Sequence, residues 1–96
     1  MILYHATQTR LTPGDCLKTK TGRGDGSILS GGAVYMTDTP ERCKRYGDVY
    51  EIECASPKTY KSALAEVGRS KKPRYTAGVY VARPADTIIL RRVSWI

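Results

Sequence analysis

In residues 48–54, polar and apolar side chains alternate along the chain (Asp-Val-Tyr-Glu-Ile-Glu-Cys). Alternation with a period of two is typical of a β-strand that buries one face and exposes the other. Short runs rich in branched and aromatic residues predict further strands at 1–6, 33–37, 78–82 and 87–93. Many short strands with few helices favour an antiparallel or mixed sheet, so an α+β fold is expected.

The sequence favours one or two short helices. Residues 40–46 follow Thr39, a good N-cap, and start with Pro40, which suits the first helical position. Gly47 can end this helix in a left-handed turn. One helical turn is expected at 62–67. Residues 8–32 are expected to form mostly loop, with a short helix at 16–21 as the alternative.

The length of 96 residues predicts a single domain over residues 1–96, near the smallest size that folds without help. Phe is absent, so tyrosines and aliphatic residues must fill the core. The three cysteines lack the spacing of a zinc site or a disulfide framework, so no metal is expected. No run approaches the roughly 20 apolar residues of a membrane span, and no signal-peptide pattern is present. A cytoplasmic protein that does not bind membranes is therefore expected.

The charge of the chain is strongly positive, with 16 Lys and Arg against nine Asp and Glu and a net charge of +7. The excess is concentrated in residues 58–74, where Glu66 is the single acid. Such a cluster attracts phosphates in a nucleic acid or a dinucleotide, or it is simply a solvated loop that keeps the protein soluble. The candidate partner-binding residues are Lys58, Lys61, Arg69, Lys71, Lys72 and Arg74.

The single histidine, His5, stands at the end of the first predicted strand in the run Tyr-His-Ala-Thr. The second predicted strand contains Val-Tyr-Met-Thr, with Tyr35 at its centre, and the expected helix ends at Tyr46. These residues resemble the ADP-ribosyltransferase fold, and especially the short rifampin ADP-ribosyltransferases. Chains of that group begin Tyr/Leu-His-Gly-Thr and continue with a Tyr-x-Thr strand and a helix. The resemblance implies a split sheet with one or two short helices and NAD as co-substrate.

The resemblance also implies roles for particular residues. His5 would bind a ribose hydroxyl, the backbone of Ala6 and Thr7 would hold the carboxamide, and Tyr35 would stack on the nicotinamide. In toxin-like and poly(ADP-ribose)-polymerase-like members two tyrosines enclose the nicotinamide, which implies Tyr35 and Tyr46 here. His5 and Tyr35 are therefore the candidate catalytic residues. The alternatives are a histidine with a structural role and a Tyr46 that only packs its helix against the sheet.

Further segments extend the resemblance over nearly the whole chain. Residues 11–17 match a Gly-Asp-x-Leu turn of the rifampin group, 49–53 its Val-Glu strand and 88–95 its C-terminal tail. Residues 78–88 are similar to a segment of RNA 2′-phosphotransferases, which share the fold and transfer phosphate from RNA to NAD using arginines. Arg74 lies near the last arginine of that family, which implies that it contacts NAD.

Two departures from the family pattern concern the site. Ala6 replaces the glycine that follows the histidine, which narrows the space for a carboxamide. The third catalytic residue, an acid, is missing from residues 54–58, where the rifampin group has it, and from 76–78, where the toxin and polymerase groups have it. Glu66 and Asp86 are the remaining stand-ins.

Two functions are therefore expected as alternatives. The first is an NAD-binding enzyme that transfers ADP-ribose to a protein, nucleic-acid or small-molecule acceptor recognised through residues 58–74. The RNA phosphotransferases work without the acid, so its absence does not exclude catalysis. The second is a catalytically inactive, basic binding protein on the same fold. Such a protein would cover a nucleic-acid or protein surface, as a phage- or mobile-element-encoded inhibitor of a host defence complex would.

Overall fold

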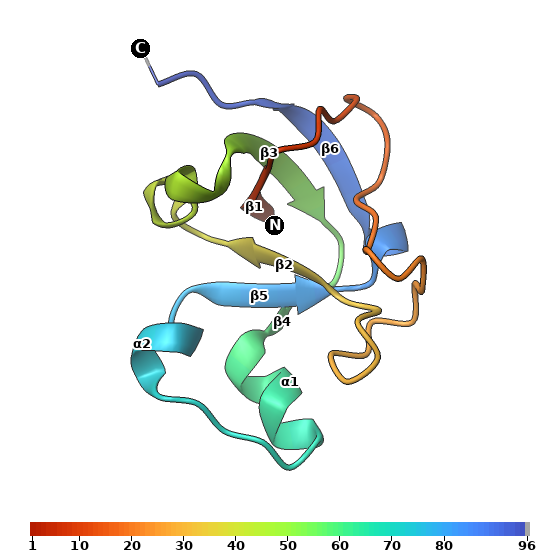
Figure 1. Cartoon of the computed structure of the whole chain (residues 1–96), viewed down its shortest axis with the longest axis vertical. Helices are drawn as coiled ribbons and strands as arrows, with labels where there is room; N and C mark the ends of the chain where they lie inside the picture. The colour runs from red at the N-terminus through yellow and green to blue at the C-terminus, as the bar shows by residue number, and fades with distance from the viewer. Residues whose placement is uncertain (96) are drawn as a thin grey trace.

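In the computed structural model, which describes residues 1–95, six strands form one sheet in the order β4-β5-β2-β1-β3-β6 (Figure 1). Neighbouring strands are antiparallel throughout. The strands are β1 (Ile2–Thr7), β2 (Val34–Thr37), β3 (Asp48–Cys54), β4 (Lys58–Thr59), β5 (Val79–Ala82) and β6 (Thr87–Arg92). The α+β class and all five predicted strands are confirmed, whereas β4 is too short to produce a recognisable alternation in the sequence.

The helices are short and lie between strands. They are η1 (Pro40–Arg42), η2 (Lys44–Tyr46), α1 (Tyr60–Glu66), α2 (Pro73–Thr76) and η3 (Pro84–Asp86). The helix expected near residues 62–67 is confirmed as α1, which is longer because the Thr59 hydroxyl accepts a hydrogen bond from the backbone N–H of Ser62 (3.2 Å) and caps it.

One helix prediction was wrong. Residues 40–46 form two separate 3₁₀ turns, and the Thr39 hydroxyl donates to the Asp38 carboxylate (3.0 Å) instead of capping them. The loop predicted for residues 8–32 is confirmed, and the alternative helix at 16–21 is absent: Leu17 is buried in the core from within this loop.

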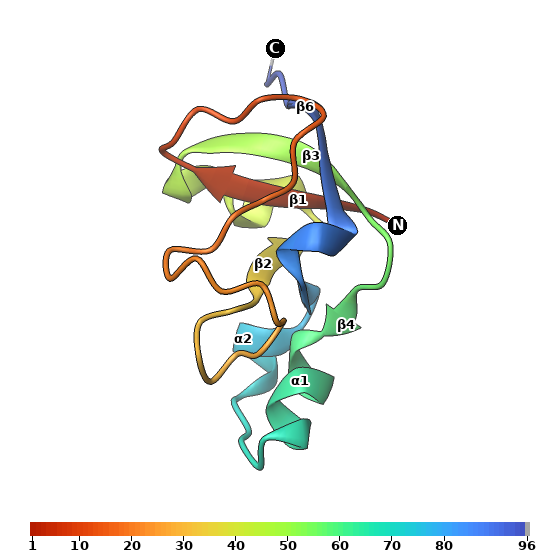
Figure 2. The same cartoon turned by 90° about the vertical axis from the view of Figure 1, so that its right-hand side faces the viewer.

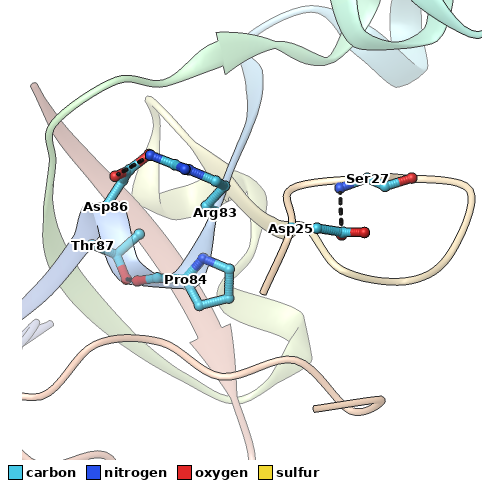
Figure 3. A network of polar contacts seen from close by, with 6 residues as sticks. All are labelled: Asp25, Ser27, Arg83, Pro84, Asp86 and Thr87. Carbon is cyan, nitrogen blue, oxygen red and sulfur yellow. Dashed lines mark hydrogen bonds and ion pairs between the residues drawn. The ribbon is translucent and has the colours of Figure 1, made fainter. Parts of the chain in front are cut away.

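The main core lies on one face of the sheet and is covered by the long loop between β1 and β2. Leu3, Ile52 and Ile89 supply its centre, and Leu17 enters it from the loop. Figure 2 shows this loop crossing in front of the sheet. The buried hydroxyl of Thr87 holds the loop in place, because it accepts from the N–H of Leu17 (2.9 Å) and donates to the Pro84 carbonyl (2.7 Å; Figure 3).

The sheet is split at its centre. β1 pairs with β3 along its whole length, but it pairs with β2 only between Tyr4 and Thr37. β2 and β5 run across the view in Figure 1, whereas β1 runs across the view in Figure 2, so the two halves of the sheet cross steeply. The halves β4-β5-β2 and β1-β3-β6 are thus joined by a single strand-paired residue pair.

Candidate functional site

His5 lies where the two halves of the sheet separate. It belongs to β1, and its Nδ1 lies 2.7 Å from the backbone carbonyl oxygen of Tyr35 in β2. Because a carbonyl oxygen only accepts, Nδ1 carries the proton of the neutral ring and Nε2 remains an acceptor. Within residues 1–95, Nε2 has no hydrogen-bond partner. Nδ1 of His5 therefore has a structural role, and Nε2 can accept a hydrogen bond from a ligand hydroxyl.

Burial lowers the pKa of His5 and outweighs the hydrogen bond to Tyr35, which raises it. The unfolded chain consequently takes up this proton at a higher pH than the folded protein. We expect the free energy of unfolding to be constant from pH 8 to about 7 and to fall as the pH drops below about 6.5, the ordinary pKa of histidine. The slope contributed by this one proton is at most about 1.4 kcal/mol per pH unit. Urea unfolding of the wild type and of His5→Gln tests this, because the variant should lack that component.

The backbone of β1 beyond His5 does not pair with β2. Ala6 and Thr7 pair with β3 on one side and have no partner in β2 on the other. In an antiparallel sheet successive residues direct their N–H and C=O groups to opposite edges, so only one of these two residues directs its backbone groups toward β3. Contact of Ala6 and Thr7 with a carboxamide stays a prediction.

The side chain of Tyr35 lies in a pocket on the α1 side of β2. Its ring meets the ring of Tyr60 edge to face, with centroids 5.4 Å apart and an interplanar angle of 88°. The pocket has a volume of about 360 Å³. Burial raises the pKa of the Tyr35 hydroxyl, with a further upward contribution from Tyr60, so the ring is uncharged at neutral pH. The pocket is lined by Ile28, Tyr35, Tyr60, Leu64, Arg69, Ser70 and Lys71.

Tyr46 and Arg74 lie elsewhere on the surface. Tyr46 is 56% exposed, and the guanidinium of Arg45 lies over its ring, 4.9 Å from the centroid. Arg74 stacks in the same way on Tyr75, at 4.7 Å. Neither Tyr46 nor Arg74 lines the Tyr35 pocket. Their contacts with NAD therefore stay predictions.

The two acids considered as stand-ins are both engaged by cations. Glu66 accepts two hydrogen bonds of 2.8 Å from Lys58, and Asp86 is held by Arg83 at 3.2 Å (Figure 3). Both acids line a second pocket, of about 340 Å³, that includes neither His5 nor Tyr35. Of the two pockets' residues, only Ile28 is shared.

Asp38 is an acid that sequence reasoning missed. It follows β2 directly, and its backbone N–H donates to the carbonyl of Gly78 (3.1 Å), at the start of β5. A Cβ atom at position 78 would lie 2.6 Å from the Asp38 carboxylate and 2.8 Å from the guanidinium of Arg42. The carboxylate of Asp38 thus occupies space that a side chain at position 78 would need. Only the pairing of β2 with β5 brings it there, so no local sequence signal indicated it.

The basic segment 58–74 includes β4, α1 and the start of α2. Lys58 is paired with Glu66, but no other cation of the segment forms an ion pair within residues 1–95. Two of these cations enter the Tyr35 pocket, and the ammonium of Lys71 lies 5.5 Å from the centroid of the Tyr60 ring. Two of the predicted partner-binding residues, Arg69 and Lys71, therefore line the same pocket as Tyr35, which the sequence did not indicate.

The three cysteines are free thiols, and burial raises the pKa of Cys43 and of Cys54. Among the described residues, no cluster of His, Cys, Asp and Glu could hold a metal ion. In the same part of the chain, no helix has the length and apolar character that a membrane span requires. A scan against protein-family models and searches of the curated proteins and the solved structures found no match to this chain.

Proposed function

We propose that this chain is an NAD-binding ADP-ribosyltransferase-like protein that transfers ADP-ribose to an acceptor. The observation that carries the proposal is the arrangement of His5 at the split in the sheet, with its Nε2 free to accept and its Nδ1 fixed to Tyr35. Two further observations support the proposal. Ala6 and Thr7 are not paired with β2, so their backbone can bind the carboxamide, and the half-exposed ring of Tyr35 can stack on the nicotinamide ring.

The residues have distinct tasks in this proposal. The neutral His5 accepts a hydrogen bond from a ribose hydroxyl, and its orientation is set by the Tyr35 carbonyl. Tyr35 holds the nicotinamide. Transfer breaks the bond between nicotinamide and ribose C1′ and forms a bond from C1′ to the acceptor, while nicotinamide leaves with the electron pair. Positioning and electrostatic stabilisation supply most of the catalysis for such a good leaving group.

The proton that the acceptor loses needs a base. Asp38 is our candidate, because its carboxylate lies at the start of β5 beside Gly78. Glu66 and Asp86 are each bound by a cation in the second pocket, which makes them less available.

Titration with NAD, with nicotinamide release followed in the same sample, tests the proposal. We expect saturable binding at or below about 1 mM, the upper range for enzyme substrates. His5→Ala should weaken it about two- to tenfold, since one hydrogen bond contributes roughly 0.5–1.5 kcal/mol. Gln8→Ala, which changes an exposed polar residue three positions later, is the control and should bind as the wild type does.

Asp38→Asn separates binding from transfer in that experiment. It should leave the NAD affinity unchanged and reduce nicotinamide release. Absence of NAD binding by the folded wild-type protein would overturn the proposal.

The basic surface favours one second function. A non-catalytic binder of an acidic partner would use the unpaired cations of residues 58–74 and would need neither His5 nor NAD. Its binding should be unchanged in His5→Ala and should be lost when these cations are reversed.

A further inference from the structure

The pocket between Tyr35 and Tyr60 has the size and the walls of a binding site for a flat ring. Its volume of about 360 Å³ is in the lower range of ligand sites, which suits a single nucleotide. The two tyrosine rings stand at 88° to each other and form adjoining walls. Ile28 and Leu64 add an apolar lining. Such walls hold an aromatic base by stacking and edge contacts, independently of its sequence identity.

The rim of this pocket carries two cations without an acidic partner, and the ammonium of one of them, Lys71, lies 5.5 Å from the centroid of the Tyr60 ring. Arg69 and Lys71 line it, and neither forms an ion pair within residues 1–95. Residues 67–77 contain no acid, and the nearest one in sequence, Glu66, is already bound by Lys58. A phosphate attached to a base in the pocket would therefore meet unpaired cations at its edge.

We infer that this pocket binds one unstacked base of a single-stranded nucleic acid, whose flanking phosphates lie on Arg69 and Lys71. A duplex keeps its bases stacked and out of reach of the half-buried ring of Tyr60. An acidic peptide would use the cations but would leave the aromatic walls without a partner. A base joined to a phosphate uses both features, because the base contacts the tyrosine rings and the phosphate contacts the unpaired cations.

In the proposed function, a single-stranded nucleic acid bound here would be the acceptor of ADP-ribose. Binding of a base in the pocket does not depend on the proposed function; only the role as acceptor rests on it. Tyr35 is common to both sites: its carbonyl holds His5, and its ring forms a wall of the pocket. Because the proposed function also uses this ring for the nicotinamide, the base and the nicotinamide would have to contact different faces of it. They would then lie next to each other, as a transfer between the two requires.

The first test needs no variant. Fluorescence anisotropy would measure the affinity of the full chain for a short single-stranded oligonucleotide and for an abasic strand of the same length and charge. Stacking of one base on an aromatic side chain contributes about 1–3 kcal/mol, so the abasic strand should bind at least about fivefold more weakly. Equal affinities for the two strands, or equal affinity for a duplex, would overturn the inference.

Variants then assign the binding to the pocket. Tyr60→Leu should weaken binding of the normal strand by about fivefold or more and leave the abasic strand unaffected, while Tyr60→Phe keeps the ring and should bind normally. The double variant Arg69→Glu/Lys71→Glu should abolish binding of both strands. Lys18→Glu/Lys20→Glu makes the same change in net charge on the exposed long loop and is the matched control. Equal losses in the two double variants would overturn the inference.

NAD titration of the same samples separates the two proposals. Binding of NAD without discrimination between normal and abasic strands would remove the pocket inference alone. Base-dependent binding of the strand without any binding of NAD would remove the proposed transferase activity and leave a nucleic-acid binding protein.

Discussion

Replacing Tyr35 by alanine is expected to weaken NAD binding by at least about fivefold and to abolish nicotinamide release. The ring supplies the stacking surface for the nicotinamide, and stacking on one aromatic side chain contributes about 1–3 kcal/mol. The substitution also removes one wall of the pocket, so the affinity for a single-stranded oligonucleotide should fall in the same protein. Calorimetry with NAD and anisotropy with the oligonucleotide measure the two effects.

Tyr35→Phe is the matched control. It keeps the ring and its contact with Tyr60, so both affinities should stay within about twofold of the wild type. The hydrogen bond of His5 goes to the backbone of residue 35 and is available to both variants. A folded Tyr35→Ala protein that binds NAD as tightly as the wild type would contradict the assignment of this ring.

Replacing Gly47 by alanine is expected to lower the free energy of unfolding by about 3 kcal/mol or more. Gly47 has φ 140° and ψ −155°, a conformation that other residues adopt only with strain of about 1–3 kcal/mol. A Cβ atom there would also lie 2.5 Å from the carbonyl oxygen of Thr7, a backbone atom that cannot move without shifting β1. Thermal and urea unfolding measure the loss. In a domain of this size the melting temperature should fall by more than about 10 °C.

Gly22→Ala separates backbone strain from steric contact. Gly22 also has a positive φ, of 74°, but a Cβ atom at this position would meet nothing within 4 Å. Its replacement should cost only about 1–2 kcal/mol, the penalty for a left-handed residue. Equal losses in the two variants would show that the contact with Thr7 contributes nothing to the requirement for glycine at position 47.

The strands were predictable because their signal is local. In β3, the apolar side chains of Tyr50, Ile52 and Cys54 recur at every second residue and are buried in the structure. Such a pattern can be read within one strand, without knowledge of its neighbours. Burial is less regular than the pattern, because Val49 beside Tyr50 is buried as well. The 58–59 strand was missed because two residues cannot display a period of two.

The helix at 40–46 was predicted incorrectly for a physical reason. The capping signals at Thr39, Pro40 and Gly47 describe favourable ends, but seven residues form too few hydrogen bonds to stabilise an α-helix by themselves. Neither of the two 3₁₀ turns that form instead contains a buried residue, so packing does not compensate for the small number of hydrogen bonds. The segment accordingly divides into two 3₁₀ turns around Cys43.

The sequence by itself determined five of the six strands, the net positive charge, the concentration of cations in residues 58–74 and the place of His5 in the first strand; the structure continues that strand two residues beyond His5, to Thr7. All of these are properties of residues close together in the chain. The tertiary structure alone decided that β1 and β2 separate beside His5, that Asp38 lies against Gly78, and that Tyr60 faces Tyr35. These contacts depend on which strands pair and in which register, and pairing is set by burial summed over the whole sheet. No short stretch of sequence carries that information.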